Sequence, residues 1–564
     1  MRSCQLPLVA IGCIIIFLNC NYNKPKPSAE DITAMGLKRG NIIECGGPAA
    51  GFGVTTFEIS CKQVQQDFDL AMAMLHSFEY DEAEKVFAGI IDKAPECSMA
   101  YWGVAMCNYH PLWAPPDKTE LAKGAKAMQV AKMLPTASPR EKAYLDAMAA
   151  FYENWEKKDH RSRSVLYNKA MERLHTKFPE DKEGAVLYAL SLDAVADPSD
   201  KSFANQKKAY RILTGLYPGQ ASHPGIVHYI IHSYDYPGLA AEALEAARGY
   251  AAIAPASAHA QHMPSHIFTR LGLWEESIKS NLKAAEAARC YAQGTGLKAH
   301  WDEELHMIDY LTYAYLQLGD NVAAKEQWDY LKTIVDVKPY NFKVSYAFAA
   351  VPARYVLENK QWKEAANLST HITEDRWIGF PWQKAILHYA RALGAARIGD
   401  IALATREADI LEALHDSLLQ QQDPYRAKQV QVQLLTAKAW TYFAKQKNDT
   451  AIKMMSSAAA LEDETEKHPV TPGEVLPARE LLADMWMEMK NPPRALDAYK
   501  ATLKKRPNRF NALYGAGLAA RLSGNKAAAD TFYHLLITVA KGDRKELREA
   551  RAYLAGSGTV QARP

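Results

Sequence analysis

The chain has 564 residues, too many for a single compact core unless the architecture is a repeat array. Apolar residues make up 48% and charged residues 23%, the ordinary balance of a folded soluble protein. The formal net charge is only +3, which excludes the strongly basic field of a typical nucleic-acid-binding protein, so we expect no nucleic-acid partner. Ala, Leu, Lys and Glu recur throughout with few β-branched runs, which predicts an all-α fold.

Residues 1–20, MRSCQLPLVAIGCIIIFLNC, have the pattern of a targeting segment. Arg2 supplies a short positive start, and the apolar stretch from Leu6 to Leu18 is too short to span a bilayer. The segment ends at Cys20, which resembles a bacterial lipoprotein signal whose cysteine is lipidated. We therefore expect an exported, periplasmic or outer-membrane lipoprotein of a bacterium, with the membrane as a partner through the lipid on Cys20. An uncleaved anchor or an ordinary secretory signal is the alternative.

Residues 21–60 are expected to form a polar tether followed by an irregular, Gly-rich lead-in, ECGGPAAGFG, that lacks the Lys-Ser/Thr pair of a phosphate loop. Export would place the cysteines beyond Cys20 in an oxidising compartment. Cys61 and Cys97 precede successive helical units, so a disulfide between them is the expected pairing. The chain has no CxxC pair that would indicate thiolate zinc or redox chemistry.

A three-residue pattern recurs along the rest of the chain. A small residue is followed four positions later by a large or small apolar one and twelve positions later by Pro: Ala83, Phe87 and Pro95; Ala243, Ala247 and Pro255; Ala495, Tyr499 and Pro507. The small residue lets two helices approach closely, and Pro ends the second helix. The step from Ala243 to Ser277 is as long as the step from Ala495 to Ala529.

This pattern resembles the tetratricopeptide repeat, a helix–turn–helix unit of about 34 residues, which is the length of both steps. The resemblance implies an all-α, right-handed superhelical solenoid whose first helices line a concave binding surface. We expect an N-terminal array over residues 61–335, a C-terminal array over residues 336–545, and a terminal helix end and tail over residues 546–564.

Six of the 17 histidines fall between His223 and His266. The steps from His228 to His262 and from His232 to His266 equal the repeat step, so the two HxxxH pairs occupy equivalent places on the first helices of adjacent repeats. Residues four apart share a helix face. These four histidines are therefore predicted to hold one divalent transition metal, for which imidazole suits Zn, Cu, Ni or Fe.

Six further residues are candidates to join this site or to orient its ligands: His223, Asp235, His259, Glu303, His306 and Asp309. His76 and His110, also separated by one repeat step, form a second candidate groove pair. Two alternatives stay open, namely that the histidines line a polar ligand groove without metal or that they only pack. Pro264, as a residue that starts helices, would leave His262 outside the helix and break its pairing with His266, or it would instead kink the helix and aim His262 inward.

Several specific segments follow one another along the chain in the order MLHSFEYDEAEKVF, HSYD, HMPSHIF and DYLTYAYLQLGD. Their combination resembles a group of bacterial tetratricopeptide-repeat proteins, and the resemblance covers roughly residues 57–335. It implies the fold and the identity of these segments but no reaction.

The function that this sequence favours is a binding or interaction scaffold of the cell envelope, which holds a protein, a peptide or a small polar ligand in its concave groove. The alternative is a metal-dependent enzyme that uses the HxxxH pairs to hold a metal with an open coordination position. A third possibility is a glycan-capture lipoprotein of the outer membrane.

Overall fold

The computed structural model describes residues 26–45, 51–112, 115–135 and 138–558. The predicted targeting segment 1–20, with Cys20, lies outside the described residues. Within the described ranges, no helix combines the length and the apolar character needed to cross a membrane.

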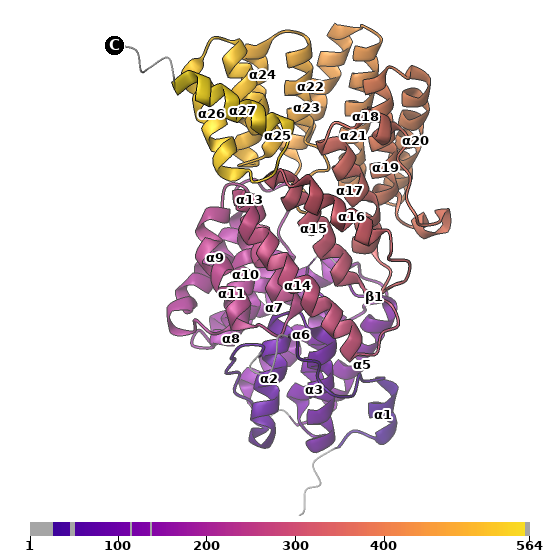
Figure 1. Cartoon of the computed structure of the whole chain (residues 1–564). Helices are drawn as coiled ribbons and strands as arrows, with labels where there is room; N and C mark the ends of the chain where they lie inside the picture. Colours follow the sequence, from indigo (N-terminus) through magenta and orange to yellow (C-terminus); the bar gives the residue numbers. More distant parts are fainter. Residues whose placement is uncertain (1–25, 46–50, 113–114, 136–137, 559–564) are drawn as a thin grey trace, which may run out of the picture.

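Consecutive helices pack in pairs along the N-terminal half (Figure 1). After the short α1 (Ala29–Ala34), the pairs are α2 (Gln65–His76) with α3 (Tyr80–Lys93), α4 (Ser98–Cys107) with α5 (Lys118–Met133), α6 (Pro139–Tyr152) with α7 (His160–Lys177), α8 (Lys182–Ala194) with α9 (Ala204–Leu216), α10 (Pro224–Tyr234) with α11 (Leu244–Ile253), α12 (Ala258–His262) and α13 (Pro264–Leu271) with α14 (Trp274–Gly294), and α15 (Asp302–Leu318) with α16 (Asn321–Leu331).

The C-terminal half continues the same arrangement and ends in a single helix. Its elements are α17 (Phe342–Glu358) with α18 (Trp362–Ala366), α19 (Pro381–Ile398) with α20 (Ile401–Gln420), α21 (Pro424–Ala444) with α22 (Asn448–Glu464), α23 (Ala478–Glu488) with α24 (Pro492–Lys505), α25 (Phe510–Leu522) with α26 (Lys526–Val539), and α27 (Lys545–Gly558). Two short parallel strands, β1 (His300–Trp301) and β2 (Val337–Lys338), pair between the halves. Four short 3-10 turns are η1 (Lys62–Val64), η2 (Tyr217–Gly219), η3 (Ala240–Ala243) and η4 (Glu374–Trp377).

The large residues of the sequence pattern pack against small residues on the next helix. Phe87 lies so close to Gly103 on the next helix that a Cβ on this glycine would be 2.3 Å from the ring. Tyr499 and Gly515, at the same spacing in the sequence, repeat this contact at 2.3 Å. The same large-into-small packing thus occurs in two repeats far apart in the chain, and the predicted all-α helical repeat fold is confirmed. Such an architecture fits a binding or interaction role.

The C-terminal half curves back onto the end of the N-terminal half, and in Figure 1 α25 and α27 lie above α13 and α15. The indole N–H of Trp274 donates to the carbonyl of Asn508 at 2.9 Å. Gly272 adopts φ +68° beside the same segment, and a Cβ there would lie 2.4 Å from the carbonyl oxygen of Pro507. The two halves therefore meet through close backbone contacts that leave no room for a side chain at this glycine.

Two disulfides fasten the N-terminal half. The structure joins Cys61 to Cys97, and it also joins Cys45 to Cys290, a pair that the sequence did not indicate. The second bond ties the lead-in segment before α2 to the far end of α14. Cys107 is a buried free thiol.

Candidate metal centre

Helix α10 brings two of the predicted ligands to one face. It begins at Pro224, after His223, whose Nδ1 accepts the backbone N–H of Ile226 at 3.3 Å and so caps the helix. Its sequence, PGIVHYIIHSY, is buried along almost its whole length because helices pack on both of its sides. His228 and His232, four residues apart, project from the same face toward α12.

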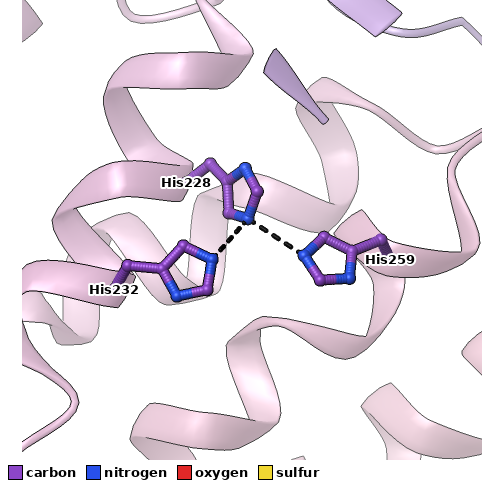
Figure 2. A group of neighbouring side chains, drawn as sticks. All are labelled: His228, His232 and His259. Atoms are coloured by element: carbon purple, nitrogen blue, oxygen red, sulfur yellow. Dashed lines mark hydrogen bonds between the residues drawn. The ribbon is translucent and has the colours of Figure 1, made fainter. Parts of the chain in front are cut away.

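His228, His232 and His259 form what we call the first triad (Figure 2). The Nε2 atom of His228 lies 2.9 Å from that of His232 and 3.1 Å from that of His259. On its other side, His228 places Nδ1 2.6 Å from the carbonyl oxygen of His76. A carbonyl only accepts, so Nδ1 of His228 carries the proton, and its Nε2 presents a lone pair to the other two rings.

His262, His266 and His306 form the second triad, and all three side chains are buried. The Nε2 atoms of His262 and His266 are 3.1 Å apart. Helix α12 ends at His262 and α13 begins at Pro264, but the chain keeps a helical course through Met263, which has φ −52° and ψ −36°. Pro264 therefore does not separate the HxxxH pair, contrary to the difficulty expected from the sequence.

The protons of the second triad can be placed from its neighbours. Asn281 donates its amide N–H to the carbonyl of Ser277 at 2.8 Å, which turns its Oδ1 toward His262 Nδ1 at 2.6 Å. His266 places Nδ1 3.1 Å from the carboxylate of Asp235. Both Nδ1 atoms thus donate, so the two Nε2 atoms that face each other at 3.1 Å each carry a lone pair. Two lone pairs at this distance repel unless a cation or a donor lies between them, and the Tyr310 hydroxyl, 3.4 Å from His266 Nε2, has only one proton to give.

A proton is a poor choice for that cation. Burial lowers the pKa of His228 to about 3, and it lowers the pKa of His266 and, more strongly, of His262. The imidazoles are therefore neutral near pH 7, which is the state that binds metal. A tetrahedral ion with metal–nitrogen bonds of about 2.0–2.1 Å separates its ligand atoms by about 3.3 Å, close to the 2.9 and 3.1 Å from His228 to its two partners and the 3.1 Å between His262 and His266.

Asp235 holds the second triad in place. It accepts His266 Nδ1 through one oxygen and Arg270 Nε through the other at 2.7 Å, and Lys467 approaches at 3.3 Å. Burial opposes ionisation of this carboxyl group, but Lys467 and Arg270 outweigh it and hold the pKa of Asp235 well below its usual range. Asp235 is thus an ionised carboxylate that orients His266, the role expected of a group behind a metal ligand.

The other two predicted carboxylates have different partners. Asp309 accepts Arg354 Nε at 2.9 Å in a buried ion pair, and Glu303 pairs with Lys343. The structure brings neither of them into a triad. The sequence placed four histidines around one metal, but the structure divides them between two triads. The third member is His259 in the first triad and His306 in the second, and the sequence gave both as possible additional members.

A third group, His76, Glu183 and His223, lies beside the first triad, but none of its ring nitrogens has a lone pair free for a metal. Glu183 accepts His76 Nε2 at 3.0 Å and His223 Nε2 at 2.8 Å. Nδ1 of His76 accepts the Tyr229 hydroxyl at 2.9 Å, and Nδ1 of His223 accepts the backbone N–H of Ile226. Every ring nitrogen is satisfied, so this group supports α2 and α10 instead of holding an ion.

His110 lies apart from His76, so the second candidate pair is not brought together. Its Nε2 is 3.0 Å from Glu120, and its ring packs against Tyr80 at 4.6 Å between centroids. His76 is the last residue of α2, whereas His110 lies beyond the end of α4 at Cys107, and only His76 contacts α10.

Two aromatic rings cover the triads. Phe78 stacks on His232 at 5.6 Å and on His259 at 5.4 Å and contacts His228 at 4.5 Å. Tyr310 packs on His262 at 4.7 Å. The sequence gave no reason to select Phe78, Tyr310, Glu183 or Asn281, although Phe78 stands two residues after His76 and Tyr310 directly follows Asp309.

A cavity of about 300 Å³ reaches the first triad at His232. Its walls come from the α8–α9 connection, from the end of α10 and from the segment between α22 and α23, and they include Phe203, Tyr236, Tyr425, Arg270, Lys467 and Pro469. The volume suits a small molecule. His232 and Asp235 both border this space, so a ligand in it would meet the first triad at His232 and the carboxylate that orients His266 of the second.

No family model and no curated protein matches the sequence. Among solved structures, the chain is similar to the human IFIT1 dimer with m7Gppp-AAAA (14% identity, 86% of this chain and 91% of that chain, TM-score 0.33). It is also similar to the Cut9–Hcn1 hetero-tetramer of the APC/C (13% identity, 87% of this chain and 90% of that chain, TM-score 0.31). A third similar structure is the tetratricopeptide-repeat domain of P58(IPK) (14% identity, 68% of this chain and 100% of that chain, TM-score 0.20). At these TM-scores the likeness supports no conclusion about function.

Proposed function

We propose that this chain is a metal-binding helical-repeat protein in which each histidine triad takes a transition metal ion. The observation that carries the proposal is the pair of Nε2 lone pairs that His262 and His266 direct at each other over 3.1 Å, with both Nδ1 protons committed elsewhere. Packing alone does not account for this arrangement, because a buried imidazole pair without a cation is better satisfied by one shared N–H.

The ligand set favours Zn or Cu over Fe. Each triad supplies three imidazoles, whereas non-haem Fe(II) sites commonly include a carboxylate. The nearest carboxylates, Asp235 and Asp309, are occupied by cationic or N–H partners. Soft thiolate chemistry is also disfavoured, because the cysteines of the described residues lie in disulfides or, for Cys107, away from the triads.

Export to the bacterial cell envelope with a lipid on Cys20 belongs to the same proposal. The two disulfides support it, because such bonds persist in oxidising compartments. Membership of the bacterial group that shares the HSYD and HMPSHIF segments is likewise proposed, on the grounds of those segments.

A second candidate function is metal-dependent catalysis on a small molecule. The cavity at His232 favours it, since three protein ligands leave a coordination position open and the cavity would give a substrate access to it. The repeat surface would in that case serve as the frame that holds the site.

Elemental analysis tests the proposal. The untagged chain from residue 21, purified without chelators and then reconstituted separately with Zn and with Cu, is compared with His228→Ala/His262→Ala and with His534→Ala, which removes an exposed histidine on α26. We expect near-stoichiometric metal in the parent and in His534→Ala and its loss in the double variant, with unchanged helical circular dichroism.

If the double variant loses its helical signal, His232→Asn replaces it, because His232 is only half-buried and its loss removes one ligand of the first triad. Absence of metal from the parent protein after reconstitution would refute the proposal, and the histidines would then be packing or groove residues.

A further inference from the structure

We infer that the two triads form one dinuclear centre, in which two metal ions lie side by side and share a small bridging anion that enters from the cavity at His232. This inference rests on the proposed function, because it requires that both triads bind metal.

Helix α12 links the triads directly. It carries His259, which belongs to the first triad, and His262, which belongs to the second. Residues three apart on a helix are surface neighbours, with Cβ atoms about 5–6 Å apart. The two ligand sets are therefore held by adjacent side chains of a single short helix.

Helix α10 links them a second time. It carries His228 and His232 of the first triad and ends at Asp235, whose carboxylate accepts His266 Nδ1 of the second triad at 3.1 Å. The same helix thus supplies ligands to one ion and orients a ligand of the other.

Charge explains why the ions would take an anion, and a bridging position lets one anion face both of them. Six neutral imidazoles leave two divalent ions with their full charge of four, in a buried site where repulsion between cations is poorly screened. Asp235 is the carboxylate that borders both the site and the cavity, and it already serves His266, Arg270 and Lys467. The compensating charge therefore has to come from a ligand, and in water that ligand is hydroxide.

The cavity gives such a ligand its route. It touches His232 and Asp235, which stand at the junction between the triads, and its floor includes the cations Arg270 and Lys467. Phe78 and Tyr310 cover other sides of the histidine rings. A small anion consequently approaches from the cavity side.

Electron paramagnetic resonance of the Cu(II)-loaded full chain tests this inference. We expect two Cu per chain, an integrated signal well below two spins and a half-field transition, because adjacent Cu(II) ions couple magnetically. His306→Ala, which removes one ligand of the second triad, should bind one tightly held Cu with an uncoupled single-spin signal; His534→Ala should match the parent.

The outcomes separate the two proposals. Failure to bind any Cu would refute the proposed function itself. Two Cu with two full spins and no half-field transition would leave that function standing and overturn the dinuclear centre, as would one Cu per chain in the parent protein. Azide supplies the test of the bridge: a new charge-transfer band in the parent and its absence in His306→Ala support it, whereas the same band in both proteins would overturn it.

Discussion

At the scale of single residues, the position of a few protons decides what the histidines can do. His262 and His266 would be ordinary buried imidazoles if either ring could carry its proton on Nε2 instead of Nδ1. Asn281 and Asp235 prevent this by accepting from those atoms, and Ser277 in turn fixes the Asn281 amide. Ligand strength at this site thus depends on residues that would not touch the metal.

The first prediction concerns Asn281. Asn281→Leu removes the acceptor for His262 Nδ1 and should weaken metal binding about 10- to 100-fold, because the ring loses its fixed tautomer and orientation. Asn281→Asp keeps an oxygen at the same place and should bind at least as tightly as the parent. Affinity is measured by competition with a chelator of known strength; equal affinity in all three proteins would contradict this role.

Glu79 gives a prediction about pH. It is buried beside Ser257, whose hydroxyl donates to it at 2.6 Å, and burial raises its pKa from 4.5 to about 7. The folded pKa lies above the unfolded one, so its contribution to stability is fully present below about pH 4.5 and is lost as the pH rises through about 7. Between these limits the change in the free energy of unfolding is about 3 kcal/mol.

Glu79→Gln should therefore gain stability relative to the parent as the pH is raised from 5 to 8. Urea unfolding of metal-free protein at both pH values checks this, with Glu79 the only group that differs. A constant difference between the two proteins across this range would show that Glu79 does not titrate there.

At the scale of elements, the repeat step predicted from the sequence that α10 and the α12–α13 pair carry equivalent HxxxH pairs. The repeat spacing does not determine which histidines share a triad, because that depends on where each helix begins and on which helices pack together. Helix α12 starts at Ala258, is capped by Ser257 and carries His259 within 3.1 Å of His228. His306 likewise reaches His262 because α15 packs on α12. Repeat spacing predicts which residues are equivalent, whereas these helix ends decide which rings meet.

The disulfides provide a prediction at this scale. The Cys45–Cys290 bond closes a loop of 245 residues and the Cys61–Cys97 bond one of 36. If both act by restricting the unfolded chain, the longer loop contributes about 2 kcal/mol more. Replacing both cysteines of the first pair by Ser should lower the urea midpoint more than the same change in the second pair, and the reverse order would contradict this explanation.

At the scale of the whole molecule, the C-terminal half completes a site that the N-terminal half begins. Arg354 on α17 bonds Asp309 on α15 and the carbonyls of Gly473 and Glu474 at 2.7–2.9 Å. Arg354 thereby holds the segment between α22 and α23 beside the triads, and Lys467 of this segment contacts the Asp235 carboxylate. No repeat pattern in the sequence marks that segment, so its position could not be predicted: it depends on how far the superhelix curves.

Removal of the metal tests whether the bound ion stabilises the folded chain. The ligands come from α10, α12, α13 and α15, so metal binds the folded chain far better than the unfolded one and should stabilise it by about 2.7 kcal/mol at a free metal concentration about 100 times Kd. Chelation should lower the Tm of the parent by several degrees and leave that of His228→Ala/His262→Ala unchanged. An equal effect of the chelator on both proteins would place the stabilising metal elsewhere.

The walls of the cavity are synthesised at different times, because they lie far apart in the sequence. His232 is synthesised long before Lys467 and Pro469, which form the opposite wall. If the N-terminal half folds before the C-terminal half, its triads can be complete while the cavity lacks a side and lies open to solvent. Ions can enter such a half-built site freely, but the enclosed space that selects a small ligand exists only after the last repeats have closed on the first.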